Sequence, residues 1–138
     1  MAADGTGRAR EDVATAELLA AGDAGAGFDR VLDLLARVVA RTGGAVGAVG
    51  IGATGRHTAG TGRLGSVAAF LPGWDGLPVV AATAERFGVP VALENDADAA
   101  ALAEHRYGPH AGTSPLVYLT LSTGVGVATV VGGRLLRG

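Results

Sequence analysis

Segments with the periodicity of helices alternate along this chain with short apolar segments that have the character of strands. Helical spacing of apolar or Ala-rich positions is found in residues 28–41, 78–87 and 97–107. Gly43 and Gly44 end the first of these segments, and Gly88 is placed to cap the second. The expected strands are residues 46–51, 89–93, 116–121 and 125–131. This alternation predicts an α/β fold, in which ligands bind at the carboxyl ends of the strands.

Two segments lack a clear periodicity. Residues 1–27 are rich in Gly, Ala and Asp, and we expect loop or edge structure there, with a plain turn at 4–7 and an extended segment at 8–15. Residues 52–77 are rich in Gly, Thr and Pro, and a loop of that length in a compact domain is usually functional or mobile. It holds the single tryptophan, Trp74, for which a core anchor is the expected role.

The composition thins the core and excludes several classes of protein. Of the 138 residues 24 are Gly and 28 are Ala, and aromatic residues make up 4%, so the core must consist of closely packed small aliphatic side chains. Without Cys there is no disulfide, no thiolate nucleophile and no cysteine-bound zinc, and the three His lack metal-motif spacing. The absence of Lys excludes a Walker-type phosphate loop.

The charge and the hydropathy of the chain indicate which partners and which cellular compartment to expect. The net charge is -2 and the basic residues are all Arg, spread along the chain, which argues against non-specific binding to nucleic acid. No apolar run approaches the roughly 18 residues of a membrane span, and the N-terminus lacks the layout of a signal peptide. We therefore expect a cytoplasmic protein with neither a membrane nor a nucleic-acid partner.

The motif Glu94-Asn95-Asp96 lies between an expected strand and an expected helix. A carboxylate at the start of a helix is kept ionised by the helix dipole and by backbone N–H groups, so Asp96 is a candidate general base for a substrate hydroxyl. Asn95 is a candidate for binding a polyol, because its amide both donates and accepts. The alternative, which spacing alone favours, is that Asn95 or Asp96 simply caps the helix.

The segment from Thr120 to Gly126 is expected to form a strand, a turn at Ser122-Thr123-Gly124 and a second strand. Exposed backbone N–H groups and hydroxyls in such a turn can bind a phosphate. The alternative is an ordinary hairpin whose glycines supply positive φ, and without further context that alternative is favoured.

Taken in order, four segments resemble the ROK family of sugar kinases and sugar-responsive repressors, with bacterial glucokinases as the nearest likeness. They are Gly50 to Gly55, Leu71 to Trp74, Val89 to Glu104 and Val117 to Gly126. The Glu-Asn-Asp segment, with Pro-Val before it and Ala-Ala-Leu-Ala-Glu after it, is fairly specific.

The resemblance implies an actin-like (ribonuclease H-like) ATPase fold of two domains, with a hexose and ATP meeting between them. It implies that Asp96 deprotonates the 6-hydroxyl of a glucose-like sugar, that Asn95 binds sugar hydroxyls, and that ATP comes with Mg²⁺. The residues it assigns to ATP are Ser122, Thr123, Gly124, Val125 and Gly126. Residues 1–114 would be the sugar-side domain, without its first strand, and residues 115–138 the start of the second domain.

The likeness is incomplete in a way that predicts a fragment. The family's opening Asp-x-Gly-Gly-Thr phosphate motif is missing, as is its C-terminal half with the His-x-Gly-His sugar-binding segment and the Cys-rich zinc motif. Within the remaining motifs the residues that differ from the usual ones are Thr54 (Pro), Phe70 (Asn), Asp98 (Asn), Ser122 (Gly) and Val127 (Gly). We therefore expect no kinase activity from this chain alone, and nucleotide binding to be the function most affected.

Two other hypotheses stay open. The sugar-sensing domain of a ROK-type repressor would use the same cleft without catalysis, and the DNA upstream of Met1 would distinguish the two by encoding a phosphate motif or a DNA-binding domain. A decayed or mis-predicted reading frame would have no stable product, which cooperative thermal unfolding of the purified chain would contradict. The sugar is left open, and a homo-oligomer is compatible with the sequence.

Overall fold

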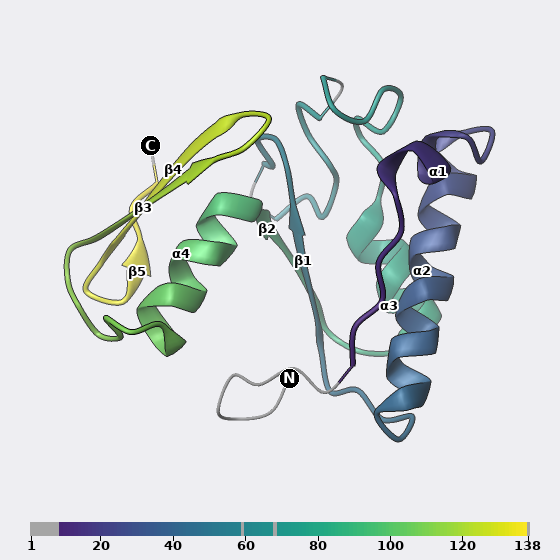
Figure 1. Cartoon of the computed structure of the whole chain (residues 1–138). Coiled ribbons are helices and arrows are strands. Elements are labelled where there is room, and N and C mark those ends of the chain that lie inside the picture. The colour runs from purple at the N-terminus through teal and green to yellow at the C-terminus, as the bar shows by residue number, and fades with distance from the viewer. Residues whose placement is uncertain (1–8, 59, 68, 138) are drawn as a thin grey trace. The chain divides into compact units, whose positions relative to one another are not determined.

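The computed structural model describes residues 9–58, 60–67 and 69–137. Its helices and strands alternate, which confirms the α/β class expected from the sequence (Figure 1). In chain order the elements are α1 (Thr15–Leu19), α2 (Ala24–Arg41), β1 (Val49–Ala53), α3 (Val79–Phe87), β2 (Val91–Asn95), α4 (Asp96–Tyr107), β3 (Leu116–Leu121), β4 (Val125–Val131) and β5 (Arg134–Leu135).

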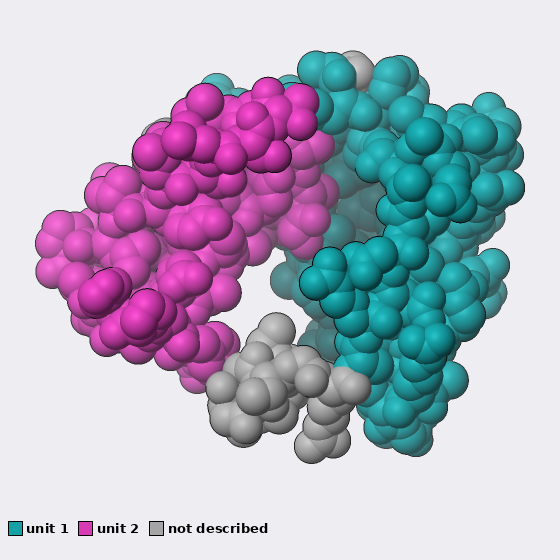
Figure 2. All heavy atoms as spheres, in the orientation of Figure 1, with its two compact units in different colours: residues 1–51, 55–93 teal, residues 52–54, 94–138 magenta. Residues whose placement is uncertain are grey.

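The elements divide into two compact units, which Figure 2 colours separately. Unit 1 comprises the chain up to Ile51 together with residues 55–93, and unit 2 comprises residues 52–54 and 94–138. Strands β1 and β2 therefore each contribute residues to both units. The expected boundary between residues 114 and 115 refers to the domains of the longer family fold, and it stays a prediction.

Helix α2 begins earlier than the apolar pattern indicates. The sequence predicts a start at Phe28, whereas the helix begins at Ala24. The reason is a side-chain cap, because Oδ1 of Asp23 accepts a 2.8 Å hydrogen bond from the N–H of Ala26. The expected apolar face is confirmed, since Phe28 and Leu32 are buried.

The expectation of loop or edge structure over residues 1–27 is wrong for helix α1. Residues 9–14 of the expected extended segment lie in neither a helix nor a strand, and residues 1–8, with the turn expected at 4–7, lie outside the described part of the chain. Helix α1 packs against α2, and Arg30 donates a 3.1 Å hydrogen bond to the carbonyl of Glu17. Helices this short depend on tertiary contacts, which a local pattern does not reveal.

Trp74 is buried in unit 1, in agreement with its expected role as a core anchor. Its ring meets that of Phe28 edge-on, with the centroids 6.4 Å apart. A Cβ atom on Gly27 would lie 2.6 Å from Cζ2 of Trp74, so the glycine allows the ring to approach α2. Leu64 and Val67 are buried as well, and the long segment between β1 and α3 is therefore partly built into the core.

Strands β1 and β2 are hydrogen-bonded neighbours, and they run parallel because they begin at the same end. The N–H of Val49, at the start of β1, donates to the carbonyl of Pro90, directly before β2, at 2.9 Å. Both strands begin later than the expected positions 46 and 89. Apolar character marks the region of a strand, but pairing decides where the strand begins, and Pro90 has no N–H to donate.

In unit 2, helix α4 packs on one face of the antiparallel sheet β3-β4-β5 (Figure 1). The register of β3 and β4 runs from Leu116 opposite Val130 to Leu121 opposite Val125, which confirms the hairpin expected from the sequence. The buried residues between helix and sheet are Ala97, Ala101, Ala128 and Val130. Small side chains on both sides allow close packing with little bulk.

The other face of the β3–β4 hairpin is aliphatic and exposed. Alternate residues of a strand point to opposite faces, so Val127 is 62% exposed while Val130 of the same strand is 0% exposed. The remaining exposed side chains of this face are Val117, Leu119, Leu121, Val125 and Val131. No helix in the described part of the chain is long and apolar enough to cross a membrane.

Candidate functional site

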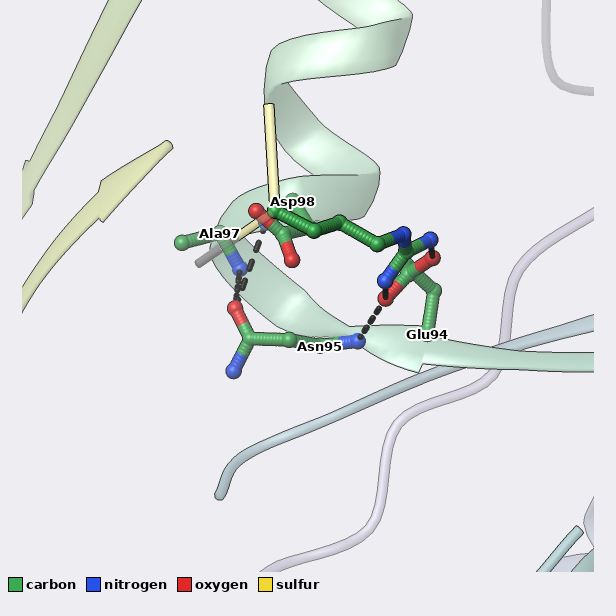
Figure 3. Close-up of polar contacts among 5 residues, drawn as sticks. Glu94, Asn95, Ala97 and Asp98 are labelled. Carbon is green, nitrogen blue, oxygen red and sulfur yellow. Dashed lines mark hydrogen bonds and ion pairs between the residues drawn. The ribbon is translucent and has the colours of Figure 1, made fainter. Parts of the chain in front are cut away.

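Asn95 caps helix α4 at the turn where β2 ends (Figure 3). Its Oδ1 accepts hydrogen bonds from the backbone N–H groups of Ala97 at 2.9 Å and Asp98 at 3.2 Å. These are two of the four N–H groups that a helix leaves without internal partners at its start. The capping role that the sequence left open therefore belongs to Asn95.

Asp96 is the first residue of α4 and its side chain is exposed. The N–H of Ala97 also lies within 2.9 Å of Oδ1 of Asp96, to which it donates. The start of a helix is also the positive end of its dipole. Because Asn95 already supplies the cap, the helix does not need Asp96 for that purpose, and the carboxylate is accessible to a hydroxyl from solvent.

Glu94, the residue before the cap, is paired with Arg137. The guanidinium Nη1 lies 3.2 Å from Oε1 of Glu94, and Nη2 makes a second, shorter contact with Oε2. Oε1 of Glu94 also accepts the N–H of Asn95 at 3.1 Å (Figure 3). The residue thus links the turn to the segment that follows β5.

Asp98, at the third position of the helix, stands where the family pattern has Asn. Burial is the main cause that raises the pKa of the Asp98 carboxyl above its ordinary value, and the negative charge of Glu94 adds to it. The charge of Arg137 lowers this pKa and that of Asp96 raises it, both to a smaller degree. Three carboxyl groups, those of Glu94, Asp96 and Asp98, therefore lie close together at the start of α4.

Glycines of two other strands face the first turn of α4, and at one of them the contact is tight. A Cβ atom on Gly52 of β1 would lie 3.9 Å from Cα of Asp96, and one on Gly126 of β4 would lie 3.1 Å from Cβ of Ala97. The second distance is tighter than ordinary van der Waals contact, so β4 reaches the helix only because residue 126 has no side chain. All of these residues belong to unit 2.

The turn between β3 and β4 directly precedes Gly126, the residue that contacts Ala97. Ser122 donates its N–H to the carbonyl of Gly124 at 2.9 Å, and the residues from Ser122 to Val125 are exposed. Of the residues that the sequence assigns to sugar and phosphate, the structure thus brings Asn95, Asp96 and Gly126 together at the start of α4. The hydroxyls of Ser122 and Thr123 lie farther out on the hairpin.

A cavity of about 370 Å³ lies at the other end of α4 and has Glu104, His110 and Tyr118 in its lining. Neither Asn95 nor Asp96 lines it. Among the described residues, no group of three or more His, Asp or Glu side chains could hold a metal ion. The Mg²⁺ that accompanies a nucleotide is usually held by one or two carboxylates together with phosphates and water, so this finding concerns only a resident metal.

Nothing in the sequence pattern singles out Arg137. It is separated from Glu94 by 43 residues, a distance at which neither helical nor strand periodicity relates two positions. The available signal is weak: an acidic residue at the end of a strand, and one of two Arg residues near position 138. Only the packing of the sheet on α4 brings the two together.

Comparison with known proteins gives matches over most of the chain. The ROK family profile matches residues 27–138. The glucokinase of Streptomyces coelicolor is 37% identical over 114 residues, which are 80% of this chain and 35% of that protein. The ROK hexokinase structure from Thermus thermophilus has a TM-score of 0.67 and 40% identity, covering 80% of this chain and 37% of its own. A ROK family glucokinase structure from Streptomyces griseus, in complex with glucose and AMPPNP, has a TM-score of 0.63 and 36% identity, covering 80% and 35%. The chain spans about a third of the length of these relatives.

Proposed function

The chain belongs to the ROK family, and we propose that it is part of an ATP-dependent sugar kinase in which Asp96 is the catalytic base. The observation that carries the proposal is the contact of Gly126 with the first turn of α4. It places the end of the turn expected to bind phosphate beside the neighbour of an exposed carboxylate at the start of a helix. Phosphoryl transfer needs such a base close to a phosphate site.

The proposed substrate is a hexose, phosphorylated at its 6-hydroxyl. Asp96 would accept the hydroxyl proton while the sugar oxygen bonds to the γ-phosphorus of ATP and the bond from that phosphorus to the oxygen of ADP breaks, so that ADP leaves; the role of the base is worth about 10² to 10⁴ in rate. Because Oδ1 of Asn95 is engaged in the helix cap, its contact with a sugar hydroxyl would fall to the amide nitrogen. The match to a glucokinase solved with glucose supports the choice of a hexose.

The residues proposed to hold the phosphates of ATP are those of the exposed turn from Ser122 to Gly126, through backbone N–H groups and the hydroxyls of Ser122 and Thr123. When bound, ATP supplies the phosphoryl group and Mg²⁺ offsets its negative charge. Alignment and charge stabilisation provide most of the catalysis of phosphoryl transfer. We therefore expect no measurable kinase activity from a chain that spans a third of its relatives. The supply of ATP makes the cytoplasm the proposed compartment.

The first test uses a chimera. The matched 114-residue segment of the Streptomyces coelicolor glucokinase is replaced by the corresponding part of this chain, which restores the length of a relative. We expect ATP-dependent phosphorylation of glucose in a coupled assay, and a fall in kcat by at least about 10²-fold in Asp96→Asn. The isolated 138-residue chain should show no turnover in the same assay.

The matched control is Asp29→Asn, which removes the same charge from an exposed position on α2 and should leave kcat unchanged. A chimera in which Asp96→Asn keeps its full kcat would remove Asp96 from the mechanism. A chimera that binds glucose in calorimetry but never phosphorylates it would favour the sugar-sensing alternative over the kinase.

A further inference from the structure

Arg137, which follows β5, lies against the turn that carries Asp96. Its guanidinium contacts both oxygens of the Glu94 carboxylate, one of them at 3.2 Å. Two-point pairing between a guanidinium and a carboxylate fixes the orientation of the acid as well as its charge. Glu94 in turn accepts the N–H of Asn95 at 3.1 Å, so the contacts run from Arg137 through Glu94 to the residue that caps α4.

The electrostatics of the turn point to the same residue. Glu94, Asp96 and Asp98 bring negative charge to the start of α4, and each of the first two raises the pKa of the Asp98 carboxyl beyond the effect of its burial. Arg137 acts in the opposite direction on Asp98. The hydrogen bond and the charge of Glu94 raise the pKa of Arg137 itself. Arg137 therefore offsets charge on a turn where carboxylates crowd together.

We propose that Arg137 is a positioning residue for the phosphoryl transfer: by holding Glu94 it keeps the strand-to-helix turn in the conformation in which Asn95 caps α4 and Asp96 stays exposed. The proposal rests on the proposed function for its link to the reaction. Arg137 acts through Glu94 and Asn95, and no contact with the reacting atoms is assigned to it.

The test on this chain needs no turnover and uses NMR on the full 138 residues. It measures amide hydrogen exchange at Ala97 and Asp98, whose N–H groups bond to Asn95, together with the pKa of the Asp98 carboxyl. In Arg137→Gln we expect about tenfold faster exchange at both amides, since a charged hydrogen-bond pair is lost, and a further rise in the pKa of Asp98. Arg137→Lys keeps the charge without the two-point geometry, so the pKa should stay near that of the parent while exchange is intermediate.

The control is Arg134→Gln, which removes an exposed arginine from β5 and should change neither quantity. Unchanged exchange and an unchanged pKa of Asp98 in Arg137→Gln would overturn the proposal. If Arg137→Gln fails to fold, Arg137→Lys tests the proposal instead. The proposal requires that this variant shows faster amide exchange at Ala97 and Asp98 and keeps the pKa of Asp98 near that of the parent.

A second arm uses the chimera, where Arg137→Gln should lower kcat about tenfold, Arg137→Lys should recover part of it, and KM for ATP should stay unchanged. If the chimera is active and its kcat is unchanged by Arg137→Gln, the positioning role is contradicted. If instead Asp96→Asn leaves kcat intact, the proposed base fails while the NMR result on Arg137 still stands, so the two failures are distinguishable.

Discussion

Three neighbouring polar residues at the end of β2 have different surroundings. Asn95 satisfies backbone N–H groups at the start of α4, and Glu94 pairs with Arg137. Asp96 is exposed at the helix terminus. Of the three, only Asp96 is exposed and not required for the cap, which is why it is the candidate for proton transfer.

Because Asn95 caps α4, replacing it should lower the stability of the chain. Asn95→Ala removes the acceptor for two backbone N–H groups, so the free energy of unfolding should fall by about 1 kcal/mol. Urea unfolding followed by circular dichroism measures the loss. Asp96→Asn is the comparison, because it leaves the cap in place and should cost less than about 0.5 kcal/mol. Equal losses in both variants would contradict the division of roles between the two residues.

The raised pKa of Asp98 predicts how the stability of the chain changes with pH. Its carboxyl has a raised pKa in the folded chain, so with rising pH the unfolded state loses this proton first, from about pH 3.9, and the stability then falls until the pH passes the folded value. Asp98→Asn removes this fall. The variant should therefore match the parent in strong acid and exceed its stability by less than about 1 kcal/mol at neutral pH, because the side chain is only half-buried.

Urea unfolding of both proteins across this pH range measures the effect. Asp29→Asn, on an exposed part of α2, controls for the loss of one negative charge. A stability difference between parent and Asp98→Asn that does not change with pH would argue against the raised pKa.

At the scale of elements, the approach of β4 to α4 depends on Gly126. A Cβ atom there would lie 2.8 Å from Cγ2 of Thr120 on β3 and 3.1 Å from Cβ of Ala97, so we expect Gly126→Ala to displace Thr120 and to loosen the contact with α4. We expect a loss of about 1–3 kcal/mol in stability, as for other overpacked sites. Amide exchange in β3 and β4, compared between variant and parent, reports it.

Gly50→Ala is the matched control, since nothing lies within 4 Å of a Cβ atom at Gly50 in β1. Its effect should be within about 0.5 kcal/mol. If Gly126→Ala were as harmless as Gly50→Ala, the close contact between β4 and the first turn of α4 would be refuted, and with it the observation that carries the proposed function.

On the scale of the whole molecule, unit 2 is one layer of helix on one layer of sheet, with the far face of the sheet exposed. Val130→Ala deletes two buried methyl groups and should cost about 2 kcal/mol. Val127→Ala deletes the same groups from the exposed face and should change the stability by less than about 0.5 kcal/mol. Urea midpoints of the two variants measure the contrast, and equal costs would mean that the exposed face is covered in solution.

Much of the fold follows from local patterns. The apolar periodicity of α2, the glycine after α3 and the hairpin of β3 and β4 act within a few residues, and each is confirmed. The first residues of the elements are predicted less well from local patterns. Capping by Asp23 makes α2 begin before the predicted position, and pairing with the segment at Pro90 makes β1 begin after it. Helix α1 escapes prediction altogether, since its stability comes from packing on α2.

Local chemistry was enough to predict a capped turn at Asn95 and Asp96, because capping preference, the helix dipole and the end of a strand all operate within one turn of chain. Local chemistry could not predict which remote residues contact that turn. The contact of Gly126 with Ala97 and the pairing of Arg137 with Glu94 join segments that are remote in the sequence. Such contacts exist only once the sheet packs on α4, because they depend on shape and charge brought together by the core rather than on any spacing along the chain.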